Sequence, residues 1–166
     1  MIRLRHGSAA ILHNKGNILL MKRGEHREIA PGFWSGPGGH FEEYEMNTPY
    51  EACYREIEEE TGICRNNIHS LELLYILFRR FKDEEIRYSY IFFGETSQTE
   101  LRQTEEGQLF WIPEGELLDR QFTPTFTLML EHYLERKAGD RAVYIGIADN
   151  DAGKLRMHWA TCEDFE

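Results

Sequence analysis

The chain has 166 residues, of which 41% are hydrophobic and 13% aromatic, and it carries a formal net charge of −10 at pH 7. This length and composition exclude a disordered chain and predict one globular domain with its own core over residues 1–166. The charge argues against a nucleic-acid polymer as ligand, because such binding depends on Lys and Arg neutralising phosphates. A small phosphate ester is compatible with it, because a divalent cation held by carboxylates supplies positive charge.

Neither export nor membrane insertion is indicated. No apolar run approaches the ~20 residues that span a bilayer, and the N-terminus lacks the apolar core of a signal peptide. The three cysteines, Cys53, Cys64 and Cys162, are odd in number and show no C-x-x-C spacing. Such a set argues against a disulfide framework or a structural zinc site. We therefore expect a soluble protein of the reducing cytoplasm, without a membrane partner.

The chain begins with the pattern of a hairpin followed by a long loop. Alternation over 3–13, the turn "NKGN" and the apolar run 18–21 predict two strands joined tightly. Residues 22–39 mix charges with Gly and Pro without a steady period, which predicts a loop of the length that often carries function.

A helix is expected next. "TPYE" at 48–51 reads as a capping box with proline at the first helical position, so the helix should begin at Pro49. Gly62 is a suitable left-handed cap, so the helix should end at Thr61.

The second half of the chain predicts more strands than helices. Aromatic and β-branched residues at 71–81, 86–93 and 108–112 predict strands, the first two paired across the charged "KDEE" turn. Thr123 and Pro124 predict the start of a helix that reaches about Lys137, with Phe126, Leu130 and Leu134 on one side and Gly139 closing it. Segments 141–148 and 154–161, joined by "DNDAG", predict a closing hairpin. Without a steady strand-helix rhythm, an α+β domain with a mixed sheet is expected.

The helix at 49–61 gathers like charges on one face. Glu56, Glu59 and Glu60 lie at i, i+3 and i+4, so they project from one side and repel one another. A solvated acidic face is the ordinary interpretation of such a run. Here, however, glutamates near a helix C-terminus oppose the helix dipole, and the helix follows "SGPGGH", whose glycine carbonyls are open to a cation. A divalent-cation site is the better interpretation, and oxygen-only ligands favour Mg²⁺ or Mn²⁺ over zinc.

The same residues resemble the Nudix box, G-x5-E-x7-R-E-U-x-E-E-x-G-U, where U is aliphatic. Every defined position over 39–63 is present: Gly39, Glu45, Arg55, Glu56, Ile57, Glu59, Glu60, Gly62 and Ile63. Nine residues rather than seven separate Glu45 from Arg55, so Glu43 and Glu42 are alternatives for the part of Glu45. The order of "NILLMKRG", "FWSGPGG", the box and "EEGQLFWIPEGELL" resembles Nudix hydrolases of the MutT type.

This resemblance implies an α/β/α sandwich around a mixed sheet and a set of site residues. The implied metal ligands are Glu56, Glu59, Glu60, the carbonyl of Gly38, and Glu106, with Glu105 as its competitor. Arg55 would hold the box glutamates by salt bridges, and Glu56 or Glu59 would serve as general base, with Glu106 as a further candidate. The segment 141–162 falls outside the clearest resemblance, and three roles are open to it: extending the sheet, covering the pocket or pairing with a second subunit.

Four residues before the helix are candidates for substrate binding. Lys22 and Arg23 could assist with charge, although solvated strand-end charges are equally expected. Trp34 could stack on a base or anchor the core. Ser35 stands where enzymes that cleanse oxidised purine triphosphates have an Asn that reads the base. His40, which follows the glycines, is more often structural than a phosphate contact.

The function implied is hydrolysis of a nucleoside diphosphate linked to a group X. The leading substrate is a nucleoside triphosphate, with 8-oxo-dGTP as a hypothesis, cleaved to monophosphate and pyrophosphate. A nucleotide sugar such as ADP-ribose is the second candidate, and a nucleotide-sensing module without catalysis is the third. The complete R-E-x-x-E-E set speaks against the third. The sequence leaves a monomer and a homodimer equally open.

Overall fold

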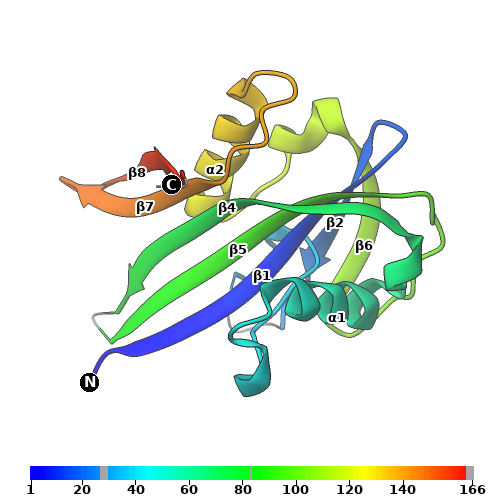
Figure 1. Ribbon diagram of the computed structural model, residues 1–166, viewed down its shortest axis with the longest axis horizontal. Coiled ribbons are helices and arrows are strands. Elements are labelled where there is room, and N and C mark those ends of the chain that lie inside the picture. Colours follow the sequence, from blue (N-terminus) through cyan, green and yellow to red (C-terminus); the bar gives the residue numbers. More distant parts are fainter. Residues whose placement is uncertain (27–29, 83, 164–166) are drawn as a thin grey trace.

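A mixed β-sheet with one α-helix on each face forms the body of the protein (Figure 1). The structure is a computed structural model that describes residues 1–26, 30–82 and 84–163. In chain order the elements are β1 (Arg3–Asn14), β2 (Asn17–Arg23), β3 (Trp34–Ser35), α1 (Pro49–Thr61), β4 (Ile68–Phe81), β5 (Glu85–Thr96), β6 (Gly107–Pro113), α2 (Pro124–Glu135), β7 (Tyr144–Asp151) and β8 (Lys154–Thr161), with 3₁₀ turns at Glu43–Glu45, Arg65–Asn67 and Glu114–Asp119.

The sheet has the order β3-β2-β1-β5-β4-β7-β8, and β6 pairs with β2. β1 pairs with β2 only next to their turn, at Leu12–Asn14, and runs parallel to β5 along most of its length. β4 is antiparallel to β5 and parallel to β7. This mixture confirms the expected α+β class and the α/β/α arrangement, because parallel neighbours need crossover connections and the helices of those connections cover the two faces.

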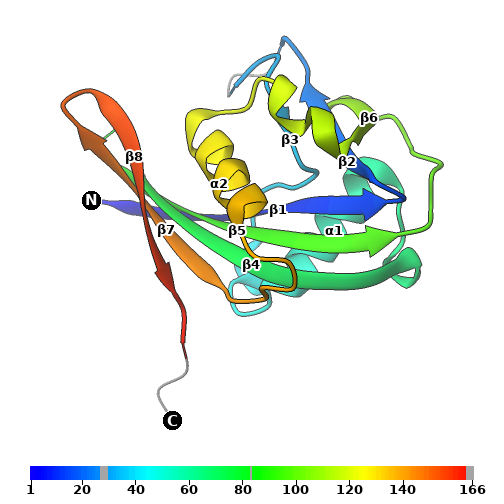
Figure 2. The same cartoon turned by 90° about the horizontal axis from the view of Figure 1, so that it is seen from above.

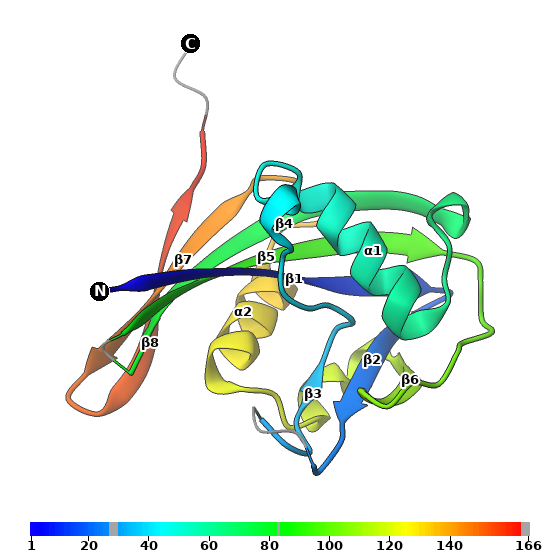
Figure 3. The ribbon, with the colours of Figure 1, turned by 90° about the horizontal axis from the view of Figure 1, so that it is seen from below.

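Two apolar clusters hold the layers together. On one face, Cys53 and Ile57 of α1 pack against β1, β2 and β5 (Figure 3). On the other, Met129 and Leu130 of α2 pack against the same sheet (Figure 2). Strand alternation sends successive side chains of β1 to opposite clusters, Ala10 to the first and Ile11 to the second. The sheet is therefore buried on both sides at its centre.

The bounds predicted for α1 are confirmed, but its predicted capping box is wrong. The helix runs from Pro49 to Thr61, and Gly62 closes it with a φ of 75°. Thr48 makes no side-chain cap and its hydroxyl instead donates to the Glu45 carbonyl at 3.4 Å. Glu51 is drawn away to an ion pair with Arg65 at 2.6 Å. A proline at the first turn starts the helix without the reciprocal bonds.

The long loop and α2 also depart from expectation. The segment 22–39 contains the end of β2 and the short strand β3, and residues 27–29 within it lie outside the described residues. α2 ends at Glu135 rather than near Lys137, and Gly139 takes its φ of 80° beyond the helix instead of capping it. Leu134 is 43% exposed, since Met129 and not Leu134 completes the buried face.

The predicted closing hairpin is confirmed, and it extends the sheet. β7 pairs with β4 over Tyr144–Ile147, and β8 pairs with β7 along its whole length. Trp159 of β8 stacks on His132 of α2 with ring centroids 4.4 Å apart, which fastens the hairpin to the helix. In the described part of the chain, no helix is both long and apolar enough to cross a bilayer.

Candidate functional site

Residues 36–39, Gly-Pro-Gly-Gly, form what we call the glycine segment. It runs alongside β1 and faces α1 on its other side. The amide N–H groups of Ala10 and Ser8 donate to the carbonyls of Pro37 and Gly39 at 2.8 and 2.9 Å. Gly38 lies between these two carbonyls, and its N–H faces α1. The Gly38 N–H accordingly donates to Glu60 Oε2 of α1 at 2.7 Å.

Both glycines are required by close approach. A Cβ on Gly38 would lie 2.1 Å from the Ser8 carbonyl oxygen, and one on Gly39 would lie 2.5 to 2.6 Å from the Glu56 carboxylate. A side chain at Gly38 would push the segment off the strand, and one at Gly39 would displace the Glu56 carboxylate. The sequence "GG" thus brings bare backbone next to two carboxylates.

Arg55 is the hub of the acidic end, the cluster of Arg55 with Glu45, Glu56, Glu59 and Glu60. It binds Glu45 in a fork, Nε to Oε1 at 2.7 Å and Nη2 to Oε2 at 2.8 Å. Its Nη1 lies 2.9 Å from Glu56 Oε1 and 2.9 Å from Glu59 Oε2. These carboxylates, Glu45 first, raise the pKa of Arg55, and the hydrogen bonds from Arg55 lower the pKa of Glu45. One cation therefore fixes three glutamates from two separate parts of the chain.

The two extra residues of the box do not displace Glu45. A turn between Glu45 and α1 takes up residues there, closed by the Thr48 N–H donating to the Glu45 carbonyl at 2.8 Å, and the Glu42 N–H donates to Glu45 Oε2 at 2.8 Å. Glu45 is 3% exposed, whereas Glu42 and Glu43 are exposed. Glu45, and neither alternative, is the partner of Arg55.

Negative charge accumulates between α1 and the glycine segment. Burial raises the pKa of Glu56, against the opposing charge of Arg55. Burial also raises the pKa of Glu60 to about 7, helped by the charges of Glu56 and Glu106 and opposed by the Gly38 N–H. Glu106 is half-buried and near enough to act on Glu60, whereas Glu105 is exposed.

The donors at this end have the chemistry of a Mg²⁺ or Mn²⁺ site, although they are not gathered around one point. Among the described residues no three acidic, His or Cys side chains are arranged to hold a metal ion. Arg55 holds Glu56 and Glu59 to one side, and the Gly38 N–H holds Glu60. The available ligands are carboxylates and a backbone carbonyl, which hard divalent cations prefer, and partly desolvated carboxylates repel one another until a cation binds. These residues fit such an ion.

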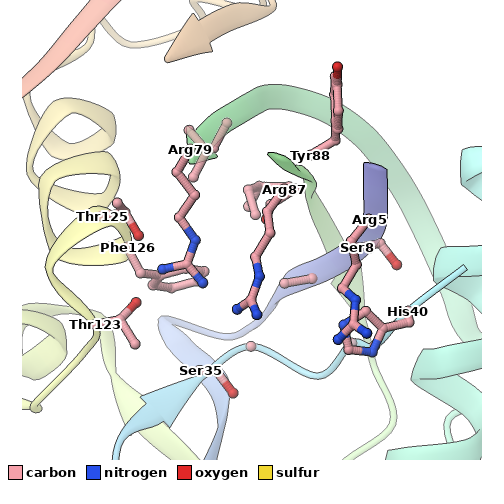
Figure 4. Close-up of a pocket in the computed structure, with 18 of the residues that line it drawn as sticks. Arg5, Ser8, Ser35, His40, Arg79, Arg87, Tyr88, Thr123, Thr125 and Phe126 are labelled. Atoms are coloured by element: carbon pink, nitrogen blue, oxygen red, sulfur yellow. The ribbon is translucent and has the colours of Figure 1, made fainter. Parts of the chain in front are cut away.

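A cavity of about 230 Å³ opens on the α2 side of the glycine segment (Figure 4). Of the predicted site residues, Gly38, Arg23 and Ser35 line it, and His40 does too. Lys22 and Trp34 are not among its lining residues. Trp34 packs against the core and lies 5.3 Å from the Phe110 ring, centroid to centroid, with the Arg120 guanidinium over its face. The roles given to all these residues stay predictions.

Three lining arginines were missed by the sequence interpretation: Arg5, Arg79 and Arg87. They come from β1, β4 and β5, and their side chains project into the same space in Figure 4. Part of the signal was present, because residues 79 and 87 flank the "KDEE" turn on its two sides, and they pair across the hairpin. The position of Arg5 beside them depends on β1 pairing with β5, which no local pattern indicates.

Comparison with known proteins adds a family, a curated relative and solved structures. A family model described as "NUDIX domain" matches residues 3–133. An "8-oxo-dGTP diphosphatase" of Proteus vulgaris is 31% identical over 90 residues, which are 54% of this chain and 76% of that protein.

The solved structures extend the likeness in fold across most of the chain. A MutT protein from Bacillus halodurans superposes with a TM-score of 0.72 at 21% identity, over 92% of this chain and 97% of that one. The Nudix domain of NrtR from Shewanella oneidensis, solved with ADP-ribose, gives 0.62 at 18% identity, over 82% and 88%. Identities this low show a shared fold and no more.

Proposed function

The chain belongs to the Nudix family of hydrolases, and on this premise we propose that it hydrolyses a nucleoside diphosphate linked to a group X, with Mg²⁺ as cofactor and Mn²⁺ as an alternative. Nudix hydrolases generally use a divalent metal ion. One observation carries the proposal: the Arg55 hub holds Glu45, Glu56 and Glu59 beside the backbone of Gly38 and Gly39.

Each part of this arrangement has a task in the proposed reaction. When bound, the metal ion neutralises the oxygens of the diphosphate and acidifies water. Gly38 and Gly39 carry no side chains, which lets their backbone approach β1 and the Glu56 carboxylate and so lie beside the proposed metal site. A glutamate, Glu56 or Glu59, accepts the proton of the attacking water, and displacement at phosphorus proceeds in line. Arg55 positions the glutamates and does not touch the substrate.

The proposed substrate is a nucleoside triphosphate, cleaved to monophosphate and pyrophosphate, with an oxidised purine such as 8-oxo-dGTP as the specific candidate. The activity in the name of the Proteus vulgaris relative supports this choice. Ser35 lines the cavity, where its hydroxyl is available to a base. The free cysteines Cys64 and Cys162 are exposed, which fits our proposal that the protein works in a reducing cytoplasm.

A panel of substrates with both metals tests this proposal. Release of products from 8-oxo-dGTP, dGTP, ADP-ribose and diadenosine polyphosphates is followed with Mg²⁺, with Mn²⁺ and with EDTA. We expect metal-dependent hydrolysis, fastest for 8-oxo-dGTP. A preference for ADP-ribose would move the substrate to the nucleotide sugars. The absence of metal-dependent turnover with every compound would refute the proposal and favour a nucleotide-sensing module.

A further inference from the structure

Three arginines form one row across three neighbouring strands. Arg5 of β1 pairs in register with Arg87 of β5, and Arg87 pairs with Arg79 of β4. The three positions share the face of the sheet that carries Ile11 and Ile91 of the α2 cluster, by strand alternation. Their side chains enter the cavity side by side (Figure 4). We call this set, Arg5, Arg79 and Arg87, the arginine row.

The row is short of negative charge. Like charges opposite one another on a sheet are destabilising, and one carboxylate, Glu85, serves two of the three arginines. Glu85 pairs with Arg87, and with Arg5 at 3.4 Å. Within the described residues, no ion pair or hydrogen bond is formed by the Arg79 side chain, which is half-buried. Burial and the charge of Arg87 lower the pKa of Arg79. A desolvated cation in this setting is stabilised by an anion supplied from outside.

A second element also directs positive charge at this place. α2 begins at Pro124, and Thr123, Thr125 and Phe126 at its first turn line the cavity (Figure 4). Thr123 makes no side-chain cap to the helix. A helix N-terminus carries partial positive charge and free N–H groups, which favour an anion. The arginine row and the start of α2 therefore face the same volume.

The row lies at a fixed distance from the backbone that receives the diphosphate. A Cβ on Gly7 of β1 would lie 2.8 Å from the Gly39 carbonyl oxygen, so the two backbones touch there. Arg5 is two residues further along the strand, which corresponds to about 7 Å at the rise of a β-strand. The next row towards the core carries Gly7, Ser89 and Leu77, of which Gly7 and Ser89 leave space for the cavity.

We propose that the arginine row binds a second phosphate of the substrate, a phosphomonoester separate from the diphosphate that is cleaved. The substrate class is then a nucleotide that carries an additional phosphate on its sugar or on X. The inference rests on the proposed function for the identity of the diphosphate substrate. The anion site itself rests on the arginine row and the start of α2.

Binding of non-hydrolysable nucleotides tests the anion site directly. Adenosine 3′,5′-bisphosphate and AMP differ by one phosphomonoester and contain no anhydride bond. By calorimetry with the full chain, we expect the bisphosphate to bind at least about tenfold more tightly than AMP, as a charge-assisted contact provides. Arg79→Gln should abolish this difference, on the same scale.

The neighbouring arginine provides a matched control. Arg80 is exposed on the opposite face of β4, so Arg80→Gln removes the same charge from the same strand and should keep the wild-type ratio. Equal affinities for AMP and the bisphosphate in the wild type would overturn the proposal. So would a preference for GMP over AMP that depends on Arg79 without any effect of the extra phosphate, because the row would then read a base.

Hydrolysis separates this inference from the proposed function. NADPH and NADH, or coenzyme A and its dephospho form, are diphosphates that differ by one phosphomonoester. We expect the phosphorylated member of each pair to have at least about tenfold higher kcat/KM, and Arg79→Gln to equalise the pair. Arg79-dependent bisphosphate binding without turnover of any diphosphate would refute the function and keep the anion site. Equal turnover within each pair would overturn the proposed substrate class and leave the diphosphatase activity intact.

Discussion

The acidic end and the arginine row are both charged clusters, but the first is mainly acidic and the second mainly basic. At the acidic end one arginine, Arg55, holds three glutamates; in the row one glutamate, Glu85, is shared by two of three arginines. Both clusters carry an excess of one sign, and both adjoin the segment that contains Gly38 and Gly39. Each excess is costly to the empty protein and is relieved by a ligand of opposite charge, which makes the two clusters complementary subsites.

The two sites are encoded differently in the sequence. The acidic end comes from one helix and the loop before it, so its spacing is visible in the sequence. The arginine row comes from three strands, and only the register of β1, β5 and β4 unites it. Substitutions at the two places should therefore differ in both the kind and the size of their effects.

The largest expected effect is on catalysis at the acidic end. Glu59→Gln removes a proposed metal ligand or base, and we expect kcat to fall by at least about 100-fold, with nucleotide binding partly retained. Steady-state kinetics on the best substrate of the panel measures it. Glu58→Gln, at an exposed position next to it on α1, is the control and should keep wild-type kinetics. A kcat for Glu59→Gln within a few-fold of wild type would remove Glu59 from the mechanism.

The next effect is on folding. Arg55→Met leaves the carboxylate of Glu45, which is 3% exposed, without its fork of hydrogen bonds. Removing one partner of a buried ion pair is strongly destabilising, and we expect a loss of about 3 kcal/mol in the free energy of unfolding. Urea denaturation measures it. The double variant with Glu45→Leu should recover part of the loss, and a double variant as unstable as the single one would contradict this cause.

Metal ions should bind at the acidic end and not at the arginine row, and their binding should stabilise the folded chain. Mg²⁺ that binds only the folded chain adds about 2.7 kcal/mol at 100 times its Kd, because mass action favours the bound state. A thermal melt at neutral pH with millimolar Mg²⁺ or Mn²⁺ should therefore shift upwards. The shift should persist in Arg79→Gln and shrink in Glu56→Gln. A melting temperature that neither metal moves would count against the metal site.

Removing an arginine from the row should stabilise the empty protein, whereas removing Arg55 from the acidic end should destabilise it. Arg79→Gln removes like-charge repulsion from Arg87, so we expect the empty protein to gain about 0.5 kcal/mol, or ~1–2 °C in melting temperature. Differential scanning calorimetry without ligand measures this. Arg80→Gln, on the outer face of the same strand, is again the matched control. A clear loss of stability in Arg79→Gln would identify Arg79 as a structural residue.

The smallest effect is the response of the row to acid. Arg87 first, and then the charges of Arg5 and Arg3, lower the pKa of Glu85 below its ordinary value of 4.5. A lowered pKa in the folded state means that Glu85 contributes stability fully above that ordinary value, and the contribution is lost as the pH falls through the lowered pKa. Melting temperatures between pH 6 and 3 should therefore fall less steeply in Glu85→Gln than in the wild type. Parallel curves would show that Glu85 is not coupled to the row.

Local patterns accounted for most of the fold and for one of the two charged subsites. Strand alternation, the "NKGN" and "DNDAG" turns and the Pro49 to Gly62 limits of α1 were all visible, because each depends on residues close in sequence. The features of helix ends that depend on tertiary packing were not visible in the sequence. Glu51 pairs with Arg65 instead of capping α1, and α2 stops at Glu135.

The same distinction applies within the site. The spacing of the acidic helix was sufficient to predict a cation site, whereas the position of Glu45 depended on a turn between Glu45 and Thr48 that the box pattern does not contain. Arg5 was out of reach, since its neighbours in space, Arg79 and Arg87, are more than 70 positions away in the chain. A single strand could not reveal which strand would lie beside it.

β1 connects the two subsites. The strand binds the glycine segment through Ser8 and Ala10 and carries Arg5 on the same continuous backbone. Paired with β5 along its length, it cannot stretch, so the two subsites keep a constant separation. When both subsites are used, the protein should therefore select substrates by the distance between their phosphates. Inserting or deleting residues in β1 would change the separation of the two subsites, and with it the preferred substrate, without changing the reaction.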